Sequence, residues 1–178
     1  TSTPSSPTAT AVPTDLATAT PDGCRELIVN GGFESSDGWA LRDTVYSARY
    51  CGEAYRGEQA SCLGIESGEE NVYSYSSVEQ VLDLPDVPHL SLSFHYYPSS
   101  TDVGEDRQYA LLLDEQGNYV SLMWIVSDAQ EWLRKEMDLS AYAGQRVTLR
   151  FGFYNDGQDG FAAMRQDGVS VCTCSSQP

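Results

Sequence analysis

The stretch VTLRFGFY, residues 147–154, alternates between apolar side chains and polar or small ones. Successive side chains of a β-strand point to opposite faces, so this alternation predicts a strand with one buried face. The face expected in the core carries Val147, Leu149, Phe151 and Phe153. The face expected to point outward carries Thr148, Arg150, Gly152 and Tyr154.

The same period of two recurs along the chain on both sides of this stretch. HLSLSFHYY, residues 89–97, places Leu90, Leu92, Phe94 and Tyr96 on one face and Ser91, Ser93, His95 and Tyr97 on the other. SVEQVLDL, residues 77–84, groups Val78, Leu82 and Leu84 with Gln80. QYALLLD and YVSLMWI flank the turn signal EQGN, so residues 108–125 are expected to form a hairpin. Further strands are expected at 25–29, 60–65, 132–138 and 163–172.

These elements predict an all-β fold. No stretch has a sustained helical period, and DLSAYAGQ, residues 138–145, is long enough for one helical turn capped by Asp138 or Ser140. About nine short alternating strands joined by turn-rich segments are typical of an antiparallel two-sheet sandwich of the jelly-roll type.

The composition excludes several classes of partner. The chain has 178 residues, a hydrophobic fraction of 40% and a formal net charge of -16. A phosphate backbone needs clustered cations, and the sequence has no basic stripe, so nucleic acid and anionic membranes are not expected as partners. No run of about 18 apolar residues could span a membrane. The sequence has neither an initiator methionine nor a signal peptide, and we expect it to be a processed chain.

The five cysteines are Cys24, Cys51, Cys62, Cys172 and Cys174. Their spacing and the two histidines suit a zinc site poorly, so disulfides in an oxidising, extracellular compartment are the better interpretation. A Cys51–Cys62 bond would close a short loop. If the terminal strands are neighbours, Cys24 pairs with Cys172 or Cys174. The thiol left over is then either buried and free or bonded to another chain.

Residues 1–22 differ from the rest of the chain because they are nearly all Thr, Ser, Pro and Ala. Such a segment buries too little apolar surface to offset its ordering entropy, so we expect an extended linker, whose Thr and Ser residues are candidates for O-glycosylation. The sandwich domain is expected over 23–174, with a short tail at 175–178.

No catalytic motif is present, and the chain is not expected to be an enzyme. The nucleophile elbow, the zinc-protease helix motif, the P-loop and the dinucleotide fingerprint are all missing from the sequence. Binding of a sugar would need aromatic planes with hydrogen-bonding groups beside them. The candidates on outward strand faces are Tyr97, Trp124 and Tyr154, with Arg150 as donor. The alternative is that these aromatic residues only stabilise the sheet through cross-strand pairs.

RELIVNGGFESSDGW, residues 25–39, places two glycines, a Phe-Glu pair and a tryptophan directly after the first predicted strand. Phe33 and Trp39 fit the end of the core, and Gly31 and Gly32 allow positive φ or a close approach of another strand. A role in core packing does not explain Glu34, because its side chain is charged. A carboxylate in such a tight corner requires a cation or several backbone N–H donors, unless it is simply solvated.

The segment ELIVNGGFE…DGW resembles the start of galactose-binding-like β-sandwich domains, which include many carbohydrate-binding modules. EWLRKEMDLSAYAGQRVTLRFGFYNDG, followed by RQDGVSV, resembles the closing half of the same domains. The resemblance covers about residues 24–173. It implies a jelly-roll sandwich whose first and last strands lie side by side, which would also support a pairing of Cys24 with the C-terminal cysteines.

The resemblance also implies a structural calcium where these strands meet. The family's ligands are commonly the Glu of the Gly-Phe-Glu motif and the first Asp of the final motif, completed by backbone carbonyls; these positions are Glu34 and Asp167 here. The sequence departs from the family at Gly168, where a second Asp is frequent. The alternative is a metal-free corner in which backbone N–H groups cap Glu34.

Two functions follow as hypotheses. The first is a non-catalytic extracellular recognition or adhesion module that binds a glycan or cell-surface polymer. The second is a structural subunit of an extracellular filament or surface assembly, whose N-terminal tail packs on an identical neighbour. The surplus cysteine and the lack of an obvious site motivate the second hypothesis.

Overall fold

The computed structural model describes residues 24–42, 44–101, 105–158 and 160–174. The expectations for the tail at 1–22 and for 175–178 lie outside these residues. Within them the chain forms eleven strands and one 3-10 turn.

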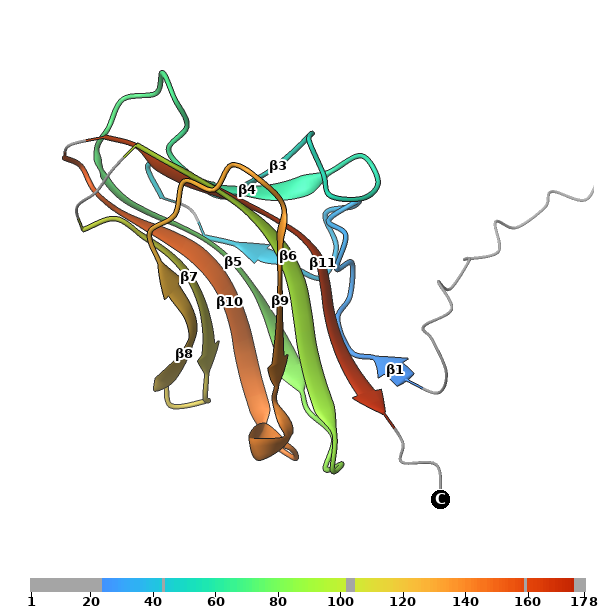
Figure 1. The fold of residues 1–178 in the computed structure, drawn as a ribbon. Helices are drawn as coiled ribbons and strands as arrows, with labels where there is room; N and C mark the ends of the chain where they lie inside the picture. Colours follow the sequence, from blue (N-terminus) through green and yellow to red (C-terminus); the bar gives the residue numbers. More distant parts are fainter. Residues whose placement is uncertain (1–23, 43, 102–104, 159, 175–178) are drawn as a thin grey trace, which may run out of the picture.

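The strands form two antiparallel sheets that face each other, as Figure 1 shows. The first sheet has the order β3 (Arg49–Cys51), β4 (Ala60–Gly64), β11 (Ala162–Cys174), β6 (Leu90–Ser100) and β9 (Leu133–Asp138), and β1 (Cys24–Glu26) also pairs with β11. The second sheet has the order β2 (Ala40–Leu41), β5 (Tyr73–Asp83), β10 (Arg146–Asp156), β7 (Arg107–Leu113) and β8 (Tyr119–Ile125). The predicted all-β, two-sheet sandwich is therefore confirmed.

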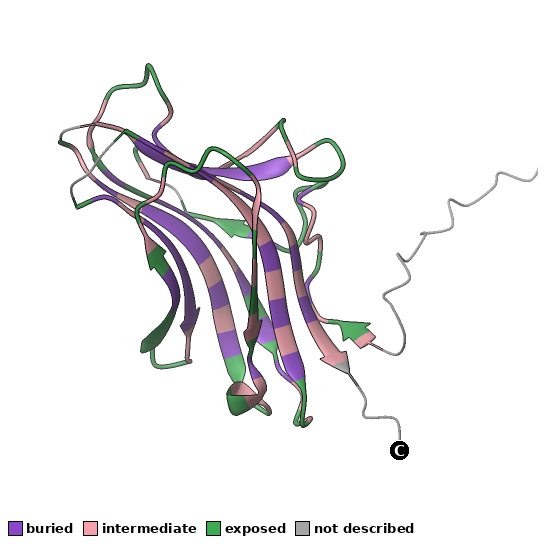
Figure 2. Cartoon of the chain, viewed as in Figure 1, coloured by how far each residue is buried: buried purple, intermediate pink, exposed green. Residues whose placement is uncertain are grey.

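The core lies between the two sheets and follows the predicted alternation. Purple and pink bands alternate along β6 in Figure 2, because every second side chain points inward. The four predicted inward residues of β10, which are Val147, Leu149, Phe151 and Phe153, are all buried. Gln80 is also buried, as its place in the apolar pattern predicts. Its side-chain amide accepts a hydrogen bond from Val29 N at 2.8 Å and donates one to Val29 O at 2.9 Å, so its polar atoms are satisfied.

The predicted hairpin and helical turn are both present with small differences. β7 and β8 pair, and the carboxylate of Asp114 organises the turn between them by accepting a hydrogen bond from Asn118 N at 2.8 Å. The turn after β9 is a 3-10 helix, η1 (Ser140–Tyr142), whose N-cap residue is Leu139. Asp138 still stabilises its start, because its carboxylate accepts hydrogen bonds from both N–H and Oγ of Ser140.

The glycine-rich segment after β1 forms the end of the core. Phe33 and Trp39 are buried and their rings stack at 4.9 Å. A Cβ on Gly31 would lie 1.9 Å from the carbonyl oxygen of Val169, so this position requires glycine for close approach to β11. Gly31 and Gly32 do not have positive φ; in this segment Asn30 (φ 54), Phe33 (φ 57) and Gly38 (φ 80) do.

The terminal strands lie side by side, as the resemblance implies. Cys24 pairs in register with Cys174 and is disulfide-bonded, and a second disulfide joins Cys51 to Cys62. Cys172 carries the free thiol. None of the described segments forms a helix with the length and hydrophobicity needed to cross a membrane.

Candidate functional site

The outer face of the second sheet carries an aromatic surface built from four neighbouring strands. Tyr154 of β10 pairs in register with Tyr75 of β5. Gly152, two residues before Tyr154 and on the same face, pairs with Tyr109 of β7, and Tyr109 in turn pairs with Trp124 of β8. The aromatic residues named here are up to 79 positions apart in the sequence. The cross-strand register places them in two adjacent rows.

Trp124 is held on this face by a flat stack. Its ring lies 5.7 Å from that of Tyr109 with an interplanar angle of 23°. Tyr109 is buried because its ring lies across Gly152, where an added Cβ would come within 2.3 Å of the phenol. Trp124, by contrast, is 52% exposed. An indole that is fixed underneath and open above presents a flat apolar plane to a ligand.

Three tyrosines continue the surface across β5 and β10. The ring of Tyr154 lies 5.1 Å from that of Tyr75 and 5.8 Å from that of Tyr73. The hydroxyls of Tyr73 and Tyr75 are hydrogen-bonded at 2.9 Å, and this bond, followed by burial, raises the pKa of Tyr75 to about 12. The Tyr75 hydroxyl therefore stays protonated at neutral pH and can both donate and accept hydrogen bonds.

A charged cluster lies beside the aromatic rows. Glu79 forms an ion pair with Arg150 at 2.7 Å and another with Arg42 at 2.9 Å. Its side chain is only 17% exposed. One carboxylate between two guanidiniums keeps each group in a fixed orientation while unused N–H donors remain on both arginines.

Four aromatic residues of this surface and Arg150 line a groove of about 430 Å³ with a mostly apolar lining. Its lining residues are Tyr75, Tyr109, Leu111, Leu113, Gly117, Tyr119, Trp124, Arg150 and Tyr154. Three of the four predicted ligand residues, Trp124, Arg150 and Tyr154, therefore meet here. The fourth, Tyr97, lies on β6 in the other sheet and does not join them.

The sequence interpretation missed Tyr75 and Tyr109. Tyr75 shares the outward face of β5 with Glu79, and extending the alternation of residues 77–84 backward by two residues would have identified it. Tyr109 gives no such signal, because β7 is buried on both faces from Gln108 to Leu112.

The two predicted calcium ligands do come together at the corner beside β11. Asp167 is fully buried, and its carboxylate accepts hydrogen bonds from the N–H groups of Arg56 at 2.8 Å and Gly168 at 2.6 Å. Glu34 accepts from Glu58 N at 2.8 Å and Gln59 N at 3.2 Å. Burial raises the pKa of Asp167, and the nearby charge of Glu34 adds to this effect.

The donor chemistry of this corner fits a hard cation, since both side chains offer carboxylate oxygens. Among the described residues no group of three or more His, Cys, Asp and Glu side chains could hold a metal. A calcium ion would therefore need backbone carbonyls to complete its shell. The hydrogen bonds that Glu34 and Asp167 accept from backbone N–H groups also agree with the alternative, in which these groups cap the carboxylates without a metal.

Comparison with known proteins gives structural matches only. No protein-family model matches the sequence, and no curated protein does either. One similar structure is a family 61 carbohydrate-binding module in complex with β-1,4-galactotriose, with a TM-score of 0.61 and 15% identity over 83% of this chain and 97% of that one. Another is a family 22 xylan-binding domain from Paenibacillus barcinonensis, with a TM-score of 0.53 and 15% identity over 84% of this chain and 96% of that one.

A third is the family 11 carbohydrate-binding module from Clostridium thermocellum in complex with a β-1,3-1,4-mixed-linked tetrasaccharide. Its TM-score is 0.51, with 13% identity over 85% of this chain and 98% of that one. At these identities the likeness concerns the fold. The chain therefore has the β-sandwich fold of carbohydrate-binding modules.

Proposed function

We propose that this chain is a non-catalytic, extracellular module that binds a glycan chain in the groove on the outer face of the second sheet. The observation that carries the proposal is the exposed Trp124 plane, stacked on Tyr109 and continued by Tyr75 and Tyr154. Pyranose rings have apolar faces that stack on such planes, and their hydroxyls need nearby donors and acceptors. Arg150 supplies donors in the groove, and Glu79 holds Arg150 in place through an ion pair.

The charge of the molecule favours a neutral polysaccharide. A net charge of -16 repels polyanions, whereas a neutral glycan is bound through stacking and hydrogen bonds that this field does not oppose. The proteins of similar fold are described with β-1,4-galactotriose, with xylan and with a β-1,3-1,4-mixed-linked tetrasaccharide, so these three ligand classes are suitable first probes.

The proposed site is tested by titrating the chain with these three glycans on an array or by calorimetry. We expect Trp124→Ala to weaken binding at least about tenfold, which corresponds to about 1.4 kcal/mol. Val81→Ala serves as the control, because Val81 is an exposed apolar residue of β5 in the same sheet that does not line the groove. Unchanged affinity in the Trp124 variant would contradict the proposed site.

We also propose that calcium binds between Glu34 and Asp167 as a structural ion. The support is a buried carboxylate whose pKa is raised and which lies beside a second carboxylate, since a cation would relieve their repulsion. The ion would hold the corner where the segment after β1 meets β11. The filament hypothesis depends on the tail at 1–22, which lies outside the described residues, and the comparisons do not support it.

A further inference from the structure

A second groove lies on the outer face of the first sheet, on the opposite side of the sandwich from the proposed site. It has a volume of about 360 Å³, and its lining includes Tyr97 of β6, Arg165 of β11 and, at its rims, Glu53, Glu66 and Gln130. Register places Tyr97 directly opposite Arg165. The groove therefore accounts for the one predicted ligand residue that is absent from the first site.

The aromatic part of this groove is fixed from two sides. The guanidinium of Arg165 lies 5.2 Å from the centre of the Tyr97 ring, and Trp132 meets the same ring edge-on at 5.8 Å. Tyr55 extends the cluster, with its ring 5.8 Å from that of Trp132. Tyr97 and Trp132 are both half-buried, so each keeps part of its ring accessible to a ligand.

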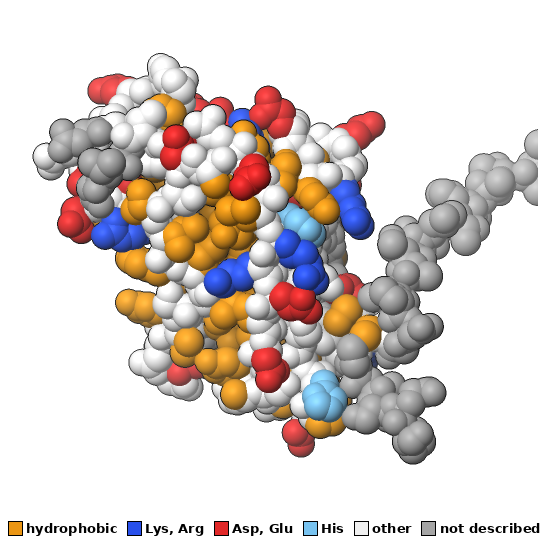
Figure 3. Space-filling model, viewed as in Figure 1, with side chains coloured by type: hydrophobic (Ala, Val, Ile, Leu, Met, Phe, Trp, Pro, Cys, Tyr) orange, Lys and Arg blue, Asp and Glu red, His pale blue; other side chains and the backbone are white. Residues whose placement is uncertain are grey.

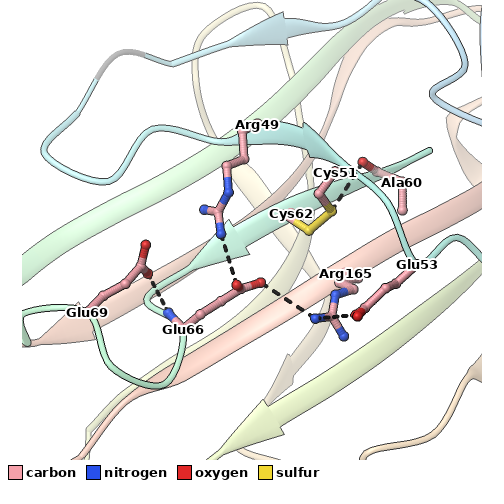
Figure 4. A network of polar contacts seen from close by, with 8 residues as sticks. All are labelled: Arg49, Cys51, Glu53, Ala60, Cys62, Glu66, Glu69 and Arg165. Carbon is pink, nitrogen blue, oxygen red and sulfur yellow. Dashed lines mark hydrogen bonds and ion pairs between the residues drawn. A yellow bond between two sulfur atoms is a disulfide. The ribbon is translucent and has the colours of Figure 1, made fainter.

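The polar groups around Tyr97 form the network drawn in Figure 4. Arg165 is ion-paired to Glu53 at 2.6 Å and lies 3.7 Å from Glu66, which also pairs with Arg49 at 3.2 Å. The Cys51–Cys62 disulfide lies next to this network in Figure 4 and ties the end of β3 to β4, two residues before Glu53. Glu69 adds a third carboxylate to the network, because it accepts a hydrogen bond from Glu66 N at 2.6 Å, and only two guanidiniums oppose the three carboxylates. The resulting negative charge disfavours an anionic ligand and suits a neutral one with many hydroxyls.

Backbone strain marks both rims of this groove. Only four non-glycine residues have positive φ in the described parts of the chain, and two of them are Glu53 (φ 65) and Gln130 (φ 50). The left-handed conformation is unfavourable for such residues and is concentrated at functional sites. Gln130 is held there by its N–H, which donates to Pro98 O at 3.1 Å, and by its side-chain amide, which donates to Asp128 at 2.9 Å.

From these observations we infer that the groove around Tyr97 is a second saccharide-binding site, which takes a neutral oligosaccharide independently of the first groove. One sugar ring stacks on Tyr97, and its hydroxyls bind the Glu53 and Gln130 side chains and the guanidinium of Arg165. A vicinal diol suits this set, because a carboxylate accepts hydrogen bonds and a guanidinium donates them. A chain with one site on each sheet can hold two glycan strands at once.

The test uses the full chain and the same three probes, which are β-1,4-galactotriose, xylan oligosaccharides and a β-1,3-1,4-mixed-linked tetrasaccharide. In the double variant Trp124→Ala/Tyr154→Ala, which removes the first groove, we expect residual binding of at least one of these probes. Adding Tyr97→Ala should weaken that residual binding at least tenfold, whereas adding Tyr97→Phe, which keeps the ring, should preserve it. Thermal melting of every variant verifies that the fold is intact.

The failures of the two sites can be told apart. Loss of all binding in the double variant, or residual binding that is unaffected by Tyr97→Ala, overturns the second site and leaves the first. Binding by the unmodified chain that depends on Tyr97 but not on Trp124 overturns the first site and leaves the second. If the unmodified chain binds none of the probes, both proposals are wrong.

Discussion

Gly152 determines the shape of the aromatic face, because Tyr109 can lie flat only where β10 has no side chain. Replacing it with alanine would place a Cβ 2.3 Å from the phenol ring and push Tyr109, and with it Trp124, out of position. We expect Gly152→Ala to lower the free energy of unfolding by about 1–3 kcal/mol, which is the usual cost of overpacking, and to weaken glycan binding.

Gly52→Ala is the control for this change, since a Cβ at that position meets nothing within 4 Å. Gly52→Ala should change the free energy of unfolding, measured with urea, by no more than about 0.5 kcal/mol. If Gly152→Ala lowers the free energy of unfolding no more than the control does, the position of Tyr109 does not depend on the absence of a side chain at residue 152.

His95 gives the protein a pH dependence below neutrality. Its ring stacks on Tyr55 at 3.7 Å, its Nδ1 is buried without a hydrogen-bond partner, and burial lowers its pKa, assisted by the charges of Arg134 and Arg56. The unfolded chain therefore takes up a proton at a higher pH, near 6.5, than the folded chain does. The contribution of His95 to the free energy of unfolding is fully present above about pH 6.5. It is lost as the pH falls toward the lowered pKa that His95 has in the folded chain.

Urea unfolding at pH 7.5 and pH 5.5 measures this contribution. We expect His95→Phe, which keeps an aromatic ring on Tyr55, to reduce the difference in stability between the two pH values. His89→Gln changes the other, exposed histidine and should preserve the difference. An equal pH dependence in the His95 variant would contradict the assignment.

At the scale of elements, the junction of the segment after β1 with β11 is where the metal proposal can be tested. An ion that binds only the folded state raises its stability, by about 2.7 kcal/mol when its concentration is a hundred times the dissociation constant. We expect millimolar calcium to raise the melting temperature and EDTA to reverse the rise, and we expect Glu34→Gln to abolish the response. Identical melting temperatures in calcium and EDTA would show instead that the N–H groups of residues 56, 58, 59 and 168 cap the carboxylates without a metal.

The long strands could be predicted from the sequence because each carries its own alternation. β6 and β10 have 11 residues each, with inward side chains at every second position over most of their length. The strands β2 and β3 have only 2 and 3 residues, which is too short for any period to be visible. The positive φ of Phe33 could not be predicted either, because glycine adopts that conformation more readily and two glycines directly precede Phe33.

At the scale of the whole molecule, the site depends on strand order, which a local pattern does not contain. Trp124, Arg150 and Tyr154 could be predicted as outward residues, but their meeting with Tyr75 and Tyr109 requires the order β5-β10-β7-β8. The same order separates Tyr97 from them by placing β6 in the other sheet. In Figure 3, hydrophobic side chains gather on the face of the molecule between β9 and the β7–β8 hairpin.

The most direct test of glycan binding on the second sheet is an NMR titration of the isotope-labelled chain with the oligosaccharide that binds best. At the lowest ligand concentrations, we expect amide shifts in β5, β7, β8 and β10, together with a shift of the Trp124 indole N–H. Shifts confined to other strands, with none in these four, would contradict the proposal that this face binds the glycan.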